Sequence, residues 1–219
     1  LTEDFLFGEN GLLHSLDPAT RGGLTVVLDD GWDVPAGSTP QKNLPVFGSL
    51  VVDSAKFPSC TGTPEERLAK LGDRVRALGY AGLGLWVAVQ ISGAAPDAVF
   101  TDAEIYAYWA ERARWCRAAG VKYWKCDWGR SDRDLRFRGL MTRAVKDNAP
   151  ELLIEHLYPI PDPLDSELPR DGAFRERMAL ARDFFRISDA LRTYDVAAEF
   201  EVPSTLQRIA DLFEGASPR

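Results

Sequence analysis

Two periods of hydrophobic and polar positions alternate along the chain. Short runs of apolar and often β-branched residues predict strands, whereas apolar residues that recur every three or four positions predict amphipathic helices. The predicted strands cover residues 24–32, 82–89, 123–127, 152–156 and 184–188. A helical pattern follows each of them, which gives a repeated strand-then-helix order.

Capping residues mark the boundaries of two of the predicted helices. Thr63-Pro-Glu-Glu66 and Thr101-Asp-Ala-Glu104 both have the form of a capping box. Gly79 and Gly120 are the expected ends of these helices, because glycine readily adopts the left-handed conformation that closes a helix. Further helices are predicted over residues 9–16, 132–148, 175–182 and 204–213.

The alternation of strands and helices predicts a parallel sheet with helical crossovers. A (β/α)8 TIM barrel is favoured over an open, doubly wound sheet, because no glycine-rich phosphate-binding turn follows the first strand. A barrel usually takes about 250 residues and eight strands. With about five βα units, residues 1–219 are therefore expected to form a partial catalytic barrel. One strand is expected before Leu24, two more after Phe213, and any accessory β domains lie outside the chain.

Composition narrows the classes of partner. The net charge of −7 argues against nucleic acid or an anionic membrane, and no apolar run is long enough to span a bilayer. The chain has three cysteines without a Cys-x-x-Cys spacing, which makes a disulfide framework improbable. It has only two histidines, which makes a histidine metal site improbable. The chain starts without an initiator methionine, so its N-terminus is expected to be missing, and its compartment and oligomeric state stay open.

The segment from Tyr123 to Gly129 is the most informative part of the sequence. Because side chains alternate along a strand, Tyr123, Lys125 and Asp127 are expected on one face, with Trp124 and Cys126 on the core side. A carboxylate next to an ammonium at the C-terminal end of a barrel strand suits a nucleophile beside a group that holds a substrate hydroxyl. A surface ion pair is the simpler alternative.

Polar or aromatic residues stand at or near the C-terminal end of every predicted strand. Carboxylates, a lysine, an arginine and indoles together indicate a pocket for a neutral, hydroxyl-rich ligand, in which two carboxylates could serve as nucleophile and acid/base. In strand order, these residues are Asp29, Asp30 and Trp32; Trp86; Lys125 and Asp127; Glu155 and His156; and Arg186 and Asp189.

In their order and spacing, these motifs resemble the retaining α-galactosidase (melibiase) superfamily of glycoside hydrolases. Asp29-Asp-Gly-Trp32 is similar to the family's sugar-holding aspartate pair, and Tyr123-Trp-Lys-Cys-Asp127 to its nucleophile strand. Phe185-Arg-Ile-Ser-Asp189 resembles its acid/base segment. Between them, Lys56-Phe-Pro58 and Leu83-Gly-Leu-Trp86 follow the family's run from loop to second strand. The resemblance extends from about residue 24 to 213.

The resemblance implies an enzyme that cleaves terminal α-galactosides, or closely related α-glycosides, without a metal or organic cofactor. Asp127 would be the nucleophile and Asp189 the acid/base, with their carboxyl groups about 5–5.5 Å apart. If the alignment slips, Asp195 would take the acid/base role. The other residues would bind the glycoside: Asp29, Asp30, Lys125 and Arg186 through hydroxyls, Trp32 and Trp86 as ring contacts, and Glu155 and His156 near the sugar's 2-position.

Two other functions are compatible with the same residues. A Mg²⁺-dependent barrel enzyme would use Asp29, Asp30 and Asp127 as oxygen ligands. A non-catalytic carbohydrate-binding barrel would keep the pocket without turnover. Activity in the presence of EDTA discriminates against the first, and covalent trapping by a galactosyl fluoride discriminates against the second.

Overall fold

The computed structural model describes residues 1–157 and 172–190, together with residues 192, 203, 206, 207, 209, 210 and 213. The chain divides into two compact units, Leu1–Ile154 and Glu155–Arg219, and each unit is described by itself.

The described residues contain a four-stranded parallel sheet in which the strands follow one another in chain order. In the register of the sheet, Leu28 is opposite Leu85, and Val87 is opposite Cys126, so the carboxyl ends of the first three strands lie side by side. The strands are β1 (Thr25–Leu28), β2 (Gly82–Val87), β3 (Val121–Cys126) and β4 (Leu153–His156).

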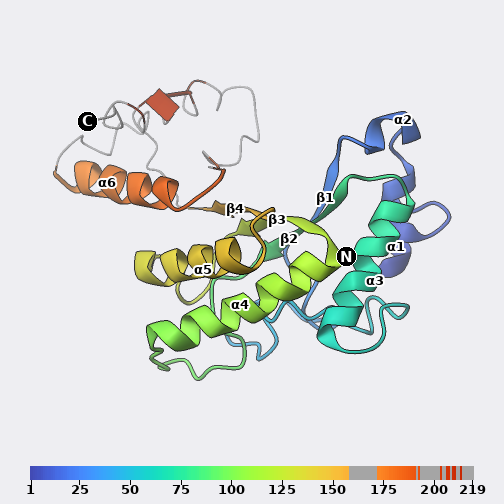
Figure 1. Ribbon diagram of the computed structural model, residues 1–219, viewed down its shortest axis with the longest axis horizontal. Helices are drawn as coiled ribbons and strands as arrows, with labels where there is room; N and C mark the ends of the chain where they lie inside the picture. The colour runs from blue at the N-terminus through green and yellow to red at the C-terminus, as the bar shows by residue number, and fades with distance from the viewer. Residues whose placement is uncertain are drawn as a thin grey trace. The chain divides into compact units, whose positions relative to one another are not determined.

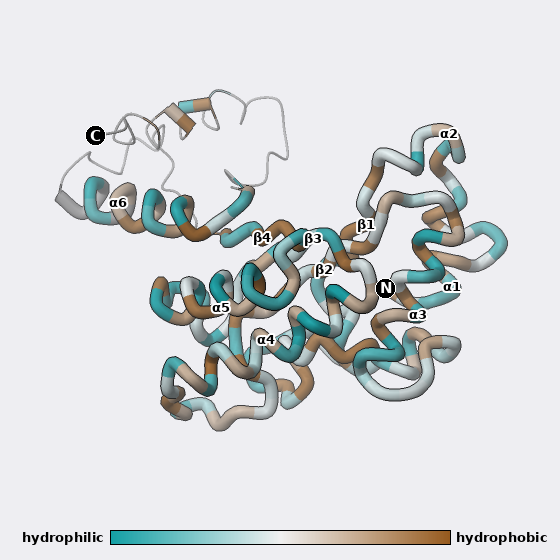
Figure 2. The backbone as a smooth tube through the Cα atoms, viewed as in Figure 1, coloured by the Kyte–Doolittle hydropathy of each residue, from teal (hydrophilic) through white to brown (hydrophobic). Residues whose placement is uncertain are grey.

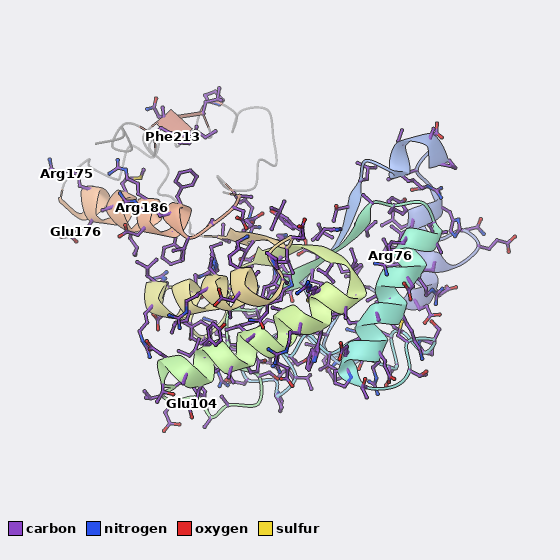
Figure 3. The ribbon with its side chains drawn as sticks, in the orientation of Figure 1. Arg76, Glu104, Arg175, Glu176, Arg186 and Phe213 are labelled. Atoms are coloured by element: carbon purple, nitrogen blue, oxygen red, sulfur yellow. The ribbon has the colours of Figure 1, made fainter. Side chains whose placement is uncertain are left out.

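Three helices connect the strands and lie beside one another along the sheet (Figure 1). They are α3 (Pro64–Ala77), α4 (Asp102–Ala119) and α5 (Leu135–Asn148). Both predicted capping boxes are confirmed. In the second of them, at the start of α4, the Glu104 carboxylate accepts a hydrogen bond from the Thr101 amide at 2.8 Å (Figure 3). Gly79 and Gly120 follow α3 and α4 in the left-handed conformation that was expected of them.

The core lies between the helices and one face of the sheet. Trp109 and Cys116 of α4 and Trp124 and Cys126 of β3 are wholly buried in it, which confirms the core-side orientation predicted for Trp124 and Cys126. Along α5, hydrophobic and hydrophilic residues alternate as expected of an amphipathic helix (Figure 2). The third cysteine, Cys60, is buried in the same core, and all three cysteines are free thiols. Burial raises the pKa of Cys116 to about 12.

The N-terminal segment differs from the prediction. No single helix covers residues 9–16; the structure has α1 (Glu3–Phe7), a 3-10 turn η1 (Leu12–His14) and α2 (Pro18–Arg21). The Thr2 hydroxyl caps α1, so a helix begins earlier in the chain than predicted. Two glycines after α1 then prevent the helix from continuing through residues 9–16. At Gly11, an added Cβ would lie 2.6 Å from the Leu6 carbonyl oxygen, so the turn depends on the absence of a side chain.

The second unit contains α6 (Gly172–Arg186), and the strand predicted over residues 184–188 is wrong. Met178, Ala181 and Phe184 are buried at a spacing of three residues, so the apolar run continues the inner face of the helix. Extended pairing starts only at Ala190, which forms an isolated parallel bridge with Glu155. Of the helix predicted over 204–213, the described residues, Leu206, Gln207, Ile209, Ala210 and Phe213, are helical.

The described residues therefore show the predicted parallel sheet with helical crossovers. This arrangement is compatible with part of a (β/α)8 barrel, and closure into a barrel stays a prediction. Across the part of the chain that the structure covers, no helix combines the length and the apolar character that crossing a membrane requires.

Candidate functional site

The carboxyl ends of β1 and β3 bring Asp29 and Lys125 into direct contact. The Lys125 ammonium nitrogen lies 3.0 Å from both Oδ1 and Oδ2 of Asp29. These residues are 96 positions apart in the chain, so the pair exists only because the parallel strands align their ends. The Asp29 side chain is 64% exposed, so its carboxylate remains accessible to a ligand from solvent.

Asp127 follows the last residue of β3, where the Trp86 indole donates a hydrogen bond from Nε1 to its Oδ2 at 3.2 Å. This neutral donor fixes the carboxylate without neutralising its charge. The neighbouring Trp32 is wholly buried and donates from its own Nε1 to the Trp86 carbonyl at 2.8 Å. A buried indole offers no ring face to a ligand, so Trp32 has a packing role in place of the predicted ring contact.

The surroundings of Asp30 favour the protonated form of its carboxyl group. Burial, followed by the nearby charges of Asp29 and Asp127, raises its pKa to about 6, although a hydrogen bond with Trp128 partly offsets this rise. Its Oδ1 is buried without a hydrogen-bond partner among the described residues. At pH values near 6, Asp30 can therefore either accept a hydrogen bond from a hydroxyl or donate one to it.

An aromatic cluster supports these carboxylates, and the sequence analysis missed two of its three members. Phe47 and Trp128 lie 4.6 Å apart between ring centroids, and Trp86 lies 5.4 Å from Phe47 and 5.6 Å from Trp128. Trp86 thus packs its faces against other rings and directs its N–H at Asp127. The position of Trp128 directly after Asp127 was an available signal, but nothing near Phe47 in the sequence pointed to the site.

The loop that holds Asp127 continues the hydrogen bonding of the sheet. The amide of Asp127 donates to the Val87 carbonyl at 3.1 Å, and the amides of Val89 and Ser131 continue the pairing with Trp128 and Val89. Gly129 makes this approach possible, because a Cβ there would lie 2.4–2.7 Å from backbone atoms of Val89. Contacts below about 3 Å are sterically forbidden, so a side chain at residue 129 must push the two loops apart.

We expect Gly129→Ala to destabilise the protein by about 1–3 kcal/mol, because the new methyl group meets backbone that cannot rotate away. Gly139→Ala is the matched control: an added Cβ meets nothing within 4 Å there, and alanine in a helix should stabilise by about 0.5–1 kcal/mol. Urea unfolding of both variants measures the difference. Equal changes in the free energy of unfolding would contradict the close approach of the loops.

The buried side chain of Arg138, from α5, holds the loop that contains Asp127. This residue was not predicted from the sequence. Its side chain donates to three backbone carbonyls: Cys126 at 3.2 Å, Asp127 at 2.7 Å and Asp132 at 2.8 Å. The residue is only 1% exposed. The planar guanidinium can serve several carbonyls at once, which a lysine ammonium cannot do with the same geometry. The backbone position of Asp127 therefore depends on Arg138.

The segment after β1 is fixed by buried polar contacts of its own. The Lys56 ammonium, which comes from the loop before α3, donates a hydrogen bond to the Gly31 carbonyl oxygen at 2.6 Å. Asp33 is 4% exposed, and its Oδ2 accepts a hydrogen bond from the Gly48 amide at 3.0 Å. Burial raises the pKa of Asp33 to about 7, although the Gly48 amide opposes the rise.

The pKa of Asp33 predicts a specific dependence of stability on pH. The folded protein keeps the Asp33 proton up to about pH 7, whereas an unfolded aspartate loses it near pH 4. Folding therefore becomes less favourable as pH rises from 4 to 7, by about 4 kcal/mol for this residue alone. Relative to the wild type, Asp33→Asn should gain stability across that window, and urea unfolding between pH 4.5 and 7.5 measures it.

The exposed Asp97→Asn provides the control for this pH series, because removing a solvated carboxylate should leave the pH dependence unchanged. A constant difference in unfolding free energy between wild type and Asp33→Asn across the window would contradict the buried, proton-holding state of Asp33.

The second unit contains the remaining predicted site residues. Glu155 and His156 at the end of β4 are buried, and the Glu155 carboxylate pairs with Nε of Arg192 at 2.9 Å. Arg186 is not at a strand end: it is the last residue of α6, exposed, and paired with Asp183 (Figure 3). Asp189 is exposed and precedes the bridge at Ala190.

Three predictions that involve residues after β4 stay predictions. Asp127 and Asp189 belong to separately described units, so the expected spacing of their carboxyl groups is not tested. Asp195, the alternative acid/base, lies outside the described residues. The hydroxyl-binding role of Arg186 is also untested, although its predicted position at the end of a strand is wrong.

The described residues hold no group of three or more His, Cys, Asp or Glu side chains arranged to bind a metal ion. Asp29 directs both oxygens at Lys125, which is unsuited to a shared cation site with Asp30 and Asp127. The Mg²⁺ alternative therefore gains no support from these side chains. The resemblance to the melibiase superfamily rests on the sequence motifs alone, because no protein-family model and no curated protein matches this chain.

Proposed function

We propose that this protein is a retaining glycoside hydrolase that cleaves terminal α-galactosides or closely related α-glycosides. One observation supports this function most directly: Asp29, Asp30, Lys125 and Asp127 converge at the carboxyl ends of β1 and β3, the two parallel strands that flank β2. Carboxylates that accept from hydroxyls, beside an ammonium that donates to them, suit a neutral sugar better than a charged metabolite. The carboxyl ends of parallel strands are also where such sheets place their active sites.

In the proposed reaction, the Asp127 carboxylate attacks the anomeric carbon while Asp189 protonates the glycosidic oxygen of the leaving group. The aglycone departs, and a covalent glycosyl-enzyme forms on Asp127. Asp189 then removes a proton from water, which hydrolyses this intermediate and regenerates both carboxyl groups. The Trp86 indole orients the nucleophile through its hydrogen bond to Oδ2. Lys125 and the Asp29–Asp30 pair hold hydroxyls of the sugar.

A 2-deoxy-2-fluoro-α-galactosyl fluoride tests this proposal, because the fluorine slows hydrolysis of the covalent intermediate. We expect stoichiometric labelling and a modified peptide that contains Asp127. A screen against nitrophenyl α- and β-glycosides then identifies the sugar and the anomer. Reversible binding of galactosides without labelling or turnover would instead establish the non-catalytic carbohydrate-binding alternative. Activity that EDTA abolishes would instead support the Mg²⁺-dependent alternative.

A further inference from the structure

The turn that carries Asp29 and Asp30 is held on both sides. At the end of β1, Oδ1 of Asp29 accepts a hydrogen bond from the Asp30 amide at 2.9 Å and another from the Lys125 ammonium at 3.0 Å. After Asp30, the Gly31 carbonyl accepts a hydrogen bond from the Lys56 ammonium at 2.6 Å. The conformation of this turn therefore depends on a lysine that lies 25 positions further along the chain.

Gly31 is the point at which this turn is least restrained by its own backbone. Its φ angle is +92°, in a region that glycine reaches without strain. Because glycine has no side chain, the peptide units on either side of it can rotate more freely than elsewhere. The hydrogen bond from Lys56 fixes the direction of the carbonyl at this point, so it supplies a restraint that glycine itself does not.

The backbone of Lys56 is fixed in turn. Its amide donates to Oδ1 of Asp53 at 2.9 Å, and its carbonyl accepts a hydrogen bond from the Glu3 amide at 2.7 Å. The next residue, Phe57, is wholly buried in the core. The ammonium therefore extends from a defined position, and the Lys56 side chain links the core to the turn after β1.

We propose that Lys56 is a positioning residue for sugar binding, which sets the Asp29–Asp30 pair for the hydroxyls of the terminal sugar. This role rests on the proposed function, in which the pair holds those hydroxyls. Hydrogen bonds between oxygens require about 2.5–3.0 Å, so even a small rotation of the turn disrupts them. These contacts are present in both the ground state and the transition state, so their loss raises KM more than it lowers kcat.

Titration calorimetry with galactose tests this role without any need for turnover. Lys56→Met keeps the aliphatic side chain but removes the donor, and it should weaken galactose affinity by about tenfold. The KM for a nitrophenyl α-galactoside should rise by a similar factor, with kcat within about threefold of the wild type. Lys56→Arg should restore most of the affinity, because it keeps a charged donor on a long side chain.

Lys70→Met is the matched control. The Lys70 ammonium also donates to a loop carbonyl, that of Thr61 at 2.8 Å, but this loop carries none of the proposed sugar contacts. A lysine that only stabilises the fold should behave like Lys70, so its loss lowers the free energy of unfolding in urea and leaves galactose affinity unchanged. Equal galactose affinity in Lys56→Met and the wild type would therefore overturn the positioning role.

Lys56→Gln decides the matter if Lys56→Met does not fold. The glutamine side chain is shorter and neutral, so it should not hold the Gly31 carbonyl and should weaken galactose binding. Unchanged affinity in this variant would equally overturn the role.

The two measurements separate this role from the proposed function. Galactose binding that depends on Lys56, without turnover of any α-galactoside, would overturn the hydrolase and keep the positioning role. Turnover with an unchanged KM in Lys56→Met would keep the hydrolase and overturn the positioning role. A wild type that neither binds galactose nor cleaves α-galactosides would overturn both.

Discussion

If the proposed double displacement is correct, Asp127→Ala should lower kcat on α-galactosides by on the order of 10⁴-fold or more, because that mechanism requires a nucleophile at this position. The protein should remain folded, since the Asp127 side chain is only half-buried and its backbone bonds to Val87 and Arg138 are retained. Azide should restore part of the rate, because the small anion can occupy the space that the carboxylate leaves. The product should then be a glycosyl azide of inverted configuration.

Asp97→Ala serves as the matched control, because it removes an exposed carboxylate in the first unit and should leave kcat unchanged. Near-normal kcat in a well-folded Asp127→Ala protein would exclude Asp127 as the nucleophile. A large loss without azide rescue and without covalent labelling of the wild type would point instead to a role in binding.

The second large effect concerns stability. Arg138→Met should lower the free energy of unfolding by about 3–5 kcal/mol, since it removes the donor of three hydrogen bonds in the interior. The carbonyls of Cys126, Asp127 and Asp132 then lose a charged partner where water is largely excluded. A loss of this size is a large fraction of the roughly 5–15 kcal/mol that stabilises a typical domain.

Arg136→Met, two positions earlier on α5, provides the matched control. Its side chain is 52% exposed and pairs with Asp102 at the surface, so its removal should cost less than about 1 kcal/mol. Arg138→Lys should fall between the two, because one ammonium cannot serve three carbonyls in the geometry of a guanidinium. Equal urea midpoints for Arg138→Met and Arg136→Met would show that the buried contacts of Arg138 contribute nothing.

Local sequence signals were sufficient for the first three strands and for helices α3 to α5, but not for the N-terminal segment before β1. The capping boxes at Thr63 and Thr101, the glycines that end their helices, and the β-branched runs each act over a few residues. The run at residues 184–188 was misleading for the opposite reason. Phe184 is apolar in either a strand or a helix, and the helix is revealed only by its burial together with Ala181 and Met178, at a spacing of three residues.

The candidate site was predicted only in part, because its chemistry and its support come from different parts of the chain. Asp29, Lys125 and Asp127 stand at strand ends, where the pattern of a parallel sheet identifies them. Arg138 and Phe47 act through the fold: the first is an ordinary helix residue in sequence, and the second lies in an irregular segment. The burial of Trp32 likewise depends on the sheet beneath it and on the Trp86 carbonyl.

The alkylation rates of the three buried thiols can report how often the core opens locally. Cys60, Cys116 and Cys126 are free and inaccessible to solvent, so an alkylating reagent can reach them only when the core opens. Cys126 directly precedes Asp127, and its alkylation rate therefore measures how often β3 separates from the helices that cover it. Under native conditions these rates convert into local opening free energies for three points of one core, without any engineered label.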